Sequence, residues 1–145
     1  MSGNAAFVER VKGLGFNVSQ FVVIGSGILD AYGIRHADDI DLVVTDELFK
    51  ELASRKSLEL TVRHDEEVVS GDINGEQVEV WRNWMTPDMQ SVADLDYLLQ
   101  YSTEVDGVRL VSLDYIEAWK KSAGRDKDLR DLELIAVYRK EQNGE

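Results

Sequence analysis

The chain has 145 residues and no cysteine, and its 28 acidic and 16 basic side chains give a formal net charge of −12 at pH 7. This length suits one domain over residues 1–145, and without cysteine neither a disulfide framework nor a thiolate metal site can form. We expect a cytoplasmic protein without a membrane span, because no apolar run approaches the roughly 20 residues that cross a bilayer. The acidic charge disfavours long nucleic acids, but it is compatible with a small anion, such as a nucleotide, that metal ions screen.

Apolar periodicity and cap residues predict alternating helices and strands in the N-terminal half of the chain. In chain order, the expected elements are a helix over residues 5–14, a strand over 21–24, a turn and short helix over 25–32, a strand over 39–44, and a helix over 45–54. Thr45 is the expected N-cap of the last helix, and Asp46 and Glu47 give it the acidic first turn that helix N-termini favour.

The C-terminal half shows the same alternation, with one strong turn signal. The expected elements are a strand over residues 58–62, a hairpin of strands 67–73 and 76–81, a helix that opens at 91–94, a strand over 108–111, and helices over 112–122 and 126–141. Asn74-Gly75 is a strong hairpin turn, and Ser91 with Asp94 has the form of a capping box. The sum is an α/β (α+β) domain in which a small mixed sheet is flanked by helices and the C-terminus is helical.

The first candidate feature is Gly25-Ser26-Gly27 at the end of the first predicted strand. Gly25 lacks a Cβ atom, so the backbone there can turn sharply and approach a ligand closely. A helix behind it would direct free N–H groups toward an anion, and the Ser26 hydroxyl could hold a phosphate oxygen. Such a sequence after a strand is also compatible with an ordinary turn.

The second feature is Asp39-Ile40-Asp41 on the next predicted strand. Alternate side chains of a strand share a face, so Asp39 and Asp41 point one way and Ile40 points into the core. Two carboxylates this close repel each other, and a divalent cation such as Mg²⁺ removes that conflict with oxygen ligands. The alternative is the solvated start of a strand. Asp38 has the opposite parity, which predicts a solvated or outer position.

Glu79 is the third candidate. Val78 and Val80 are expected to face the core, so Glu79 lies on the opposite face of its strand. If this strand lies beside the strand that carries Asp39 and Asp41, Glu79 completes a site of three carboxylates. Otherwise it is one more exposed glutamate.

The fourth feature is the segment 120–130, which holds five of the sixteen basic residues in an otherwise acidic chain. Arg binds phosphate oxygens as a fork and Lys binds them as a point charge. The candidates for such contacts are Lys120, Arg125 and Lys127. A charged, solvated junction between two helices is the alternative.

In this order, the four features resemble the nucleotidyltransferase superfamily, which includes DNA polymerase β and many small-molecule nucleotidyltransferases. Its pattern is a strand, Gly-Ser or Gly-Gly at a helix start, a spacer, an Asp-hydrophobic-Asp strand, and a later acidic residue on a neighbouring strand. Twelve residues separate Ser26 from Asp39, which is within the family's range. Residues 33–38 and 120–131 are also similar to segments of small stand-alone prokaryotic members, including abortive-infection-type toxins, so the resemblance spans residues 21–134.

The resemblance implies a nucleotidyltransferase fold and a role for each candidate residue. Asp39 and Asp41 would bind the metal that bridges the triphosphate, and Glu79 would bind a second metal or act as a base. The family more often has Asp than Glu at this third position. Gly25 and Ser26 would hold the β- and γ-phosphates. The remaining implied roles are phosphate or base contacts for Lys120, Arg125 and Lys127, with Asp128 and Asp131 orienting that basic segment.

The reaction implied by the resemblance is transfer of a nucleoside monophosphate from an NTP to an acceptor, with Mg²⁺ (or Mn²⁺) as cofactor and a two-metal in-line displacement. The acidic charge favours a small acceptor, such as an aminoglycoside-like antibiotic, while a protein or tRNA acceptor stays open. No acceptor domain is recognisable, so the acceptor would bind on the remaining surface or across a homodimer interface. The alternative is a catalytically silent nucleotide-binding sensor or toxin–antitoxin partner. Intact Asp39 and Asp41 argue against such a degenerate site.

Overall fold

The computed structural model describes residues 2–144 of the chain. Its strands are β1 (Phe21–Ile24), β2 (Asp39–Val44), β3 (Glu59–Arg63), β4 (Glu66–Ile73), β5 (Glu76–Trp81), β6 (Asn83–Met85), β7 (Val92–Asp94), β8 (Ser102–Val105) and β9 (Val108–Val111). Its helices are α1 (Ser2–Lys12), the 3₁₀-helix η1 (Val18–Gln20), α2 (Gly27–Ala31), α3 (Asp46–Ala53), α4 (Leu95–Leu99), α5 (Leu113–Ala123) and α6 (Asp126–Gln142). The predicted α/β class is confirmed.

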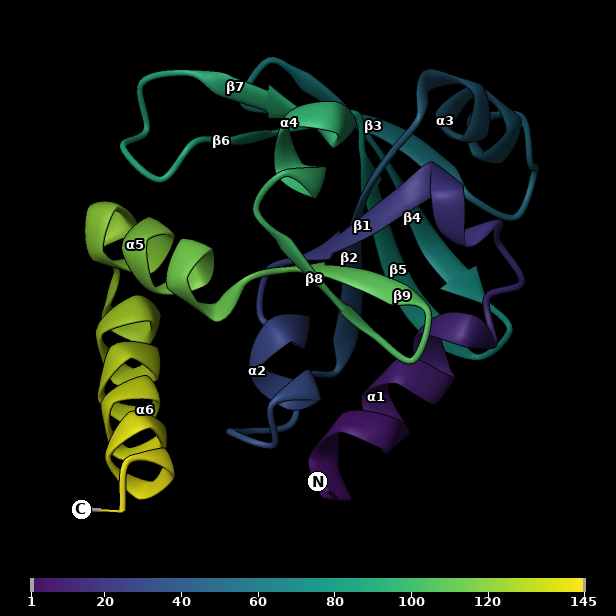
Figure 1. The fold of residues 1–145 in the computed structure, drawn as a ribbon. Helices are drawn as coiled ribbons and strands as arrows, with labels where there is room; N and C mark the ends of the chain where they lie inside the picture. The colour runs from purple at the N-terminus through teal and green to yellow at the C-terminus, as the bar shows by residue number, and fades with distance from the viewer. Residues whose placement is uncertain (1, 145) are drawn as a thin grey trace.

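A seven-stranded mixed sheet forms the centre of the fold, in the order β3-β4-β5-β2-β1-β9-β8, and β6 and β7 form a separate two-stranded sheet. Strand β2 pairs antiparallel with β1 and parallel with β5. Helices pack around this sheet, and α5 with α6 forms a helical hairpin at one side of it (Figure 1). The C-terminal end of β1 therefore lies beside the N-terminal half of β2, with Ile24 opposite Asp41.

The core confirms the expected apolar positions on the central strands. Strand β1 is buried at every position, which suits a β-branched run in the middle of a sheet. On β2, Ile40 and Leu42 are fully buried while Asp39 is exposed, as the parity of a strand requires. Gly27 belongs to this core, because a Cβ atom there would lie 2.4 Å from the ring of Phe7 on α1. The third residue of the Gly-Ser-Gly segment thus serves the packing of α1 against α2.

Several local signals give the predicted structure. Thr45 accepts a hydrogen bond from the N–H of Leu48 and caps α3, and Ser112 caps α5 in the same way. Asn74 and Gly75 have φ angles of 52° and 88°, so the hairpin turn between β4 and β5 is as expected. Within residues 2–144, every helix is too short or too polar to cross a membrane.

The capping box expected at residues 91–94 is wrong. Residues Val92–Asp94 form strand β7 against β6, and Asp94 is the N-cap of a short helix, α4, through the N–H of Tyr97. The carbonyl of Ser91 instead accepts the N–H of Thr86, which closes the hairpin. Val92 is consequently 56% exposed and lies outside the helix, which begins only at Leu95. Strands β6 and β8 were not predicted, because pairing partners decide short strands more than their own residues do.

Candidate active site

A cavity of about 610 Å³ opens beside the end of β1 and the first half of β2. It is lined by polar residues on one part and by aromatic residues on another. All eight residues predicted from the sequence line it, namely Gly25, Ser26, Asp39, Asp41, Glu79, Lys120, Arg125 and Lys127. The fold thus brings together segments that are about 100 residues apart in the chain.

Three carboxylates face this cavity from neighbouring strands. The register pairs Asp41 of β2 with Ile24 of β1 on one side and with Glu79 of β5 on the other. Asp39 precedes Asp41 by two residues and lies on the same face. Burial, with the negative charges of Glu79 and Asp39, raises the pKa of Asp41 to about 7. The cluster therefore holds more negative charge than its surroundings neutralise.

Gly25 brings the backbone into contact with this cluster. Its φ angle is +72°, a conformation that side chains rarely adopt, and a Cβ atom there would lie 2.7 Å from Oδ2 of Asp41. Any larger residue would push the carboxylate away from its position. Glycine is therefore required at the junction of β1 and α2 for two separate reasons.

The oxygen donors of Asp39 and Asp41 suit a hard divalent cation such as Mg²⁺. Glu79 is placed beside them, but its Oε2 accepts a hydrogen bond of 2.8 Å from Nη1 of Arg63. Within residues 2–144, no set of three or more Asp, Glu or His side chains is arranged as a ready metal site. The oxygen donors of the two aspartates are thus compatible with one cation, and the ion pair with Arg63 occupies one of the two carboxylate oxygens of Glu79.

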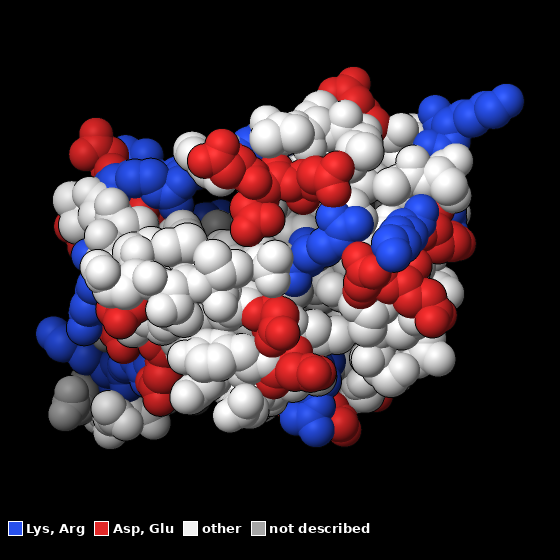
Figure 2. Space-filling view, turned by 90° about the horizontal axis from the view of Figure 1, so that it is seen from above, with Lys and Arg blue, Asp and Glu red and all other residues white. Residues whose placement is uncertain are grey.

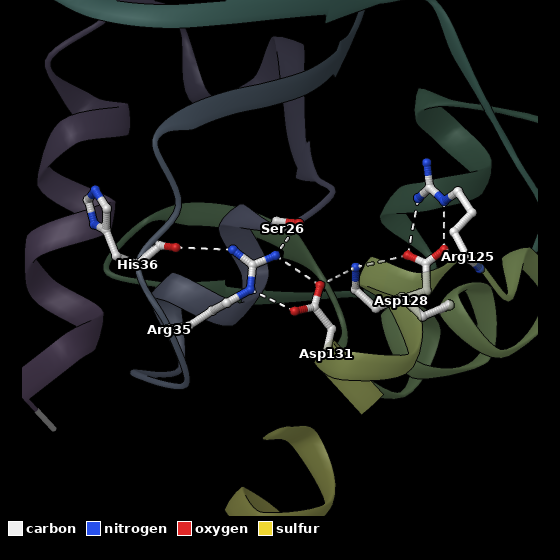
Figure 3. A network of polar contacts seen from close by, with 7 residues as sticks. Ser26, Arg35, His36, Arg125, Asp128 and Asp131 are labelled. Carbon is white, nitrogen blue, oxygen red and sulfur yellow. Dashed lines mark hydrogen bonds and ion pairs between the residues drawn. The ribbon is translucent and has the colours of Figure 1, made fainter. Parts of the chain in front are cut away.

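The Ser26 hydroxyl is held by an arginine that sequence reasoning did not assign to the site. Nη2 of Arg35 donates to Ser26 Oγ at 2.9 Å, and the same guanidinium makes a bidentate ion pair with Asp131 on α6 (Figure 3). Helix α2 has only five residues. The expected contribution of a helix N-terminus to anion binding is therefore small.

The three predicted basic residues differ in how free they are. Lys120 is buried, and its Nζ is 2.9 Å from Asp131 and 3.5 Å from Asp128. The guanidinium of Arg125 donates two hydrogen bonds to Asp128, of 2.6 and 3.1 Å, and the Arg125 side chain is 49% exposed. Lys127 is exposed, and its positive charge opposes part of the rise in the pKa of Asp41. The structure thus places all three at the cavity, with the charges of Lys120 and Arg125 already paired.

The chain is similar to a known protein in structure, while its sequence gives no match. No protein-family model and no curated protein matches the sequence. Among solved structures, the crystal structure of a "putative nucleotidyltransferase" from Thermotoga maritima superposes with a TM-score of 0.54 and 19% sequence identity, over 97% of this chain and 95% of that one. This chain has a nucleotidyltransferase-like fold. At this identity the similarity shows the fold alone, and the chemistry depends on the residues described above.

An aromatic wall completes the cavity of this nucleotidyltransferase-like fold. Trp84 of β6 and Trp119 of α5 stack with ring centroids 4.8 Å apart, and Trp81 lies two residues beyond Glu79 on β5. The guanidinium of Arg125 lies 5.3 Å from the ring of Trp119. Strand parity places Trp81 on the same face as Glu79, but the contact of β6 with α5 depends on tertiary packing. One part of the cavity thus suits a flat or apolar group.

Proposed function

We propose that this chain is a metal-dependent nucleotidyltransferase, which moves a nucleoside monophosphate from an NTP to an acceptor. The observation that carries this proposal is the cluster of Asp39, Asp41 and Glu79 on one face of the sheet, in contact with the Gly25-Ser26 turn. A fold similar to that of a protein described as a "putative nucleotidyltransferase" supports it. The cavity is also large enough for a ligand of nucleotide size.

Each residue has a role in this proposal that follows from its position. Asp39 and Asp41 hold Mg²⁺ (or Mn²⁺), and the metal, when bound, neutralises charge on the triphosphate and on the leaving pyrophosphate. Ser26 donates a hydrogen bond from its hydroxyl to a phosphate oxygen, and Lys127 supplies a positive charge near Asp41. Glu79, once released from Arg63, either joins the metal site or takes the proton of the acceptor hydroxyl.

The bond changes balance without any other reactant. The acceptor oxygen attacks the α-phosphorus, the bond from that phosphorus to the bridging oxygen breaks, and pyrophosphate leaves. The proton of the acceptor hydroxyl passes to a base, and Glu79 is the carboxylate that we propose for this role. In such an in-line displacement, bound cations would stabilise the attacking oxygen and the leaving oxygen, which lie on opposite sides of the phosphorus.

A small acceptor suits the surface better than a long nucleic acid. The net charge of −12 repels polyanions. On the face seen in Figure 2, Asp and Glu form several groups and Lys and Arg form no continuous stripe. A neutral or cationic molecule with a free hydroxyl could approach the carboxylates and pack on the aromatic wall of Trp84 and Trp119.

Pyrophosphate release tests the proposal. The wild-type protein with Mg²⁺ and each of the four NTPs should release pyrophosphate when a suitable acceptor, such as an aminoglycoside, is added. Asp41→Asn should lower the rate at least about a hundredfold, because it removes a metal ligand. Asp38→Asn is the matched control, since the Asp38 side chain is 91% exposed and has the opposite parity. Release that Asp41→Asn leaves unchanged would contradict the proposal.

The sensor alternative gives a different result in the same assay. A silent nucleotide-binding protein would bind NTP in a way that depends on Asp41, yet release no pyrophosphate with any acceptor. Binding and release measured on one preparation therefore separate the two functions.

A further inference from the structure

Ser26 occupies a position where serine normally caps a helix, but it does not act as a cap. It is the N-cap residue of α2, and its side chain makes no capping hydrogen bond. A serine at this position usually accepts an N–H from the first turn of its helix. Here Oγ instead accepts a hydrogen bond of 2.9 Å from Nη2 of Arg35, nine residues later in the chain.

The identity of the donor fixes the role of the hydroxyl. A guanidinium has N–H donors and no acceptor, so Ser26 Oγ must be the acceptor in this contact. The hydroxyl then keeps its own proton for another partner, and Ser26 lines the cavity where that partner would lie. A positive charge on the oxygen side also makes the O–H a stronger donor. The Ser26 hydroxyl is thus prepared to donate to an anionic oxygen.

Arg35 is itself held from the C-terminal helix. Its Nε and Nη2 donate to the two carboxylate oxygens of Asp131 at 2.7 and 2.8 Å, and its Nη1 donates to the carbonyl of His36 at 3.1 Å. Asp131 is only 4% exposed, and Lys120 Nζ lies 2.9 Å from it. Hydrogen bonds from Arg35 and Lys120 hold the pKa of Asp131 below its usual range although burial alone would raise it. Four of the five guanidinium N–H groups of Arg35 are thereby used.

Arg35 does not itself line the cavity, so the contacts point to an indirect role. We propose that Arg35 is a positioning residue, which orients the Ser26 hydroxyl as a donor to the triphosphate, and that Asp131 sets this orientation from α6. This inference rests on the proposed function. It goes beyond it by making the buried ion pairs of the α5–α6 hairpin part of nucleotide binding.

A double-mutant cycle on nucleotide affinity tests this inference. The probes are the non-hydrolysable α,β-imido analogues of ATP, GTP, CTP and UTP with Mg²⁺, titrated by calorimetry. Arg35→Gln should weaken binding of the preferred analogue about five- to tenfold, the range expected when one hydrogen bond is lost. In a Ser26→Ala background, the same substitution should change the affinity less than about twofold, because the hydroxyl through which Arg35 acts is absent.

Two further variants separate positioning from charge and from general stability. Arg35→Lys keeps the charge but cannot form the fork to Asp131 and also reach Ser26, so it should not restore the affinity. Arg139→Gln removes the ion pairs of α6 with Asp114 and Glu117 of α5, and it should leave the affinity unchanged. Urea unfolding of each variant before the titration serves as the control that the variant is folded.

The outcomes are distinct. A loss of affinity that is equally large with and without Ser26 would overturn the positioning role and leave the proposed function intact. Full recovery of affinity in Arg35→Lys would also overturn it, because charge alone would then suffice. Failure of the wild-type protein to bind any of the four analogues would overturn the proposed function together with this inference.

Discussion

At the scale of single residues, Asp41 is the carboxylate that its neighbours affect most, because Glu79 and Asp39 carry the same negative charge beside it. Its pKa is raised to about 7, from 3.8 in an unfolded chain, by burial and by Glu79 and Asp39. The native carboxyl therefore binds its proton more tightly than the unfolded one does. The free energy of unfolding should fall as the pH rises from about 4 through about 7, because over this range the unfolded carboxyl has lost its proton while the native one still holds it.

The raised pKa of Asp41 predicts a pH dependence of the free energy of unfolding that the substitution Asp41→Asn removes. In EDTA, the free energy of unfolding of Asp41→Asn should gain on that of the wild-type protein as the pH rises from 5 to 8. The gain over this range should be roughly 3 kcal/mol at most, because about two of the roughly three units of the pKa shift lie above pH 5 and each unit corresponds to about 1.4 kcal/mol. Urea unfolding at both pH values measures it. Parallel pH curves for the two proteins would show that Asp41 does not titrate in this range.

Gly25 is predicted to matter through contact as well as through its backbone angle. Gly25→Ala should cost about 1–3 kcal/mol of stability and weaken the binding of an NTP analogue with Mg²⁺ more than about tenfold, because the added methyl displaces Asp41. Gly107→Ala is the control, since Gly107 has φ +85° with open space around its Cβ position. It should lose stability and keep its affinity. Equal affinities for the two variants would contradict the role of the Gly25 contact.

Arg63 is predicted to compete with the metal. Arg63→Gln should tighten the binding of Mn²⁺ alone about three- to tenfold, because a cation that pairs with Glu79 at 2.8 Å is removed from the cluster. Electron paramagnetic resonance of free Mn²⁺ measures this directly. Arg82→Gln, which breaks ion pairs with Asp46 and Glu67 away from the cavity, should leave Mn²⁺ affinity unchanged. Weaker Mn²⁺ binding after Arg63→Gln would mean that Arg63 supports the site.

At the element scale, the helical hairpin of α5 and α6 carries one side of the cavity and is fixed by buried charges. Lys120 lies between Asp128 and Asp131, which are almost fully buried. Buried carboxylates that lose a cation keep the cost of desolvation without its compensation. The hairpin therefore depends on an ion network as well as on apolar packing.

A pair of adjacent lysines tests this dependence. Lys120→Met should lower the free energy of unfolding by about 3 kcal/mol or more. The neighbouring Lys121 is exposed, and Lys121→Met should change stability by less than about 0.5 kcal/mol. Chemical denaturation of both variants at pH 7 gives the comparison. Similar small losses in both would show that the network contributes little to the fold.

Local signals explain which elements could be predicted. Asn74-Gly75 and Thr45 each act through their own backbone neighbours, so the hairpin and the cap of α3 were visible in the sequence. Ser91 and Asp94 matched a cap pattern equally well, yet pairing with β6 prevailed. The outcome there depends on a partner strand that no local pattern reveals.

For the site, too, local features could be predicted from the sequence, while contacts that depend on the packing of the whole molecule could not. Asp39 and Asp41 could be paired from strand parity, because that geometry is local. The meeting of Arg63 with Glu79 depends on the order β3-β4-β5, and that of Arg35 with Asp131 depends on how α6 packs against the body. Long side chains that cross between elements are therefore the part of the site that sequence reasoning missed.

The net charge of −12 acts at the scale of the whole molecule. The electrostatic field of the protein repels an anionic nucleotide unless bound cations offset the charge. The most direct test is the dissociation constant of a non-hydrolysable NTP analogue, measured with and without Mg²⁺ for the wild-type protein, Asp39→Asn and Asp38→Asn. We expect Mg²⁺ to tighten binding at least about tenfold in the wild-type protein and in Asp38→Asn, and to have no effect in Asp39→Asn. Binding that ignores Mg²⁺, or that Mg²⁺ tightens equally in Asp39→Asn, would contradict a metal-bridged nucleotide site.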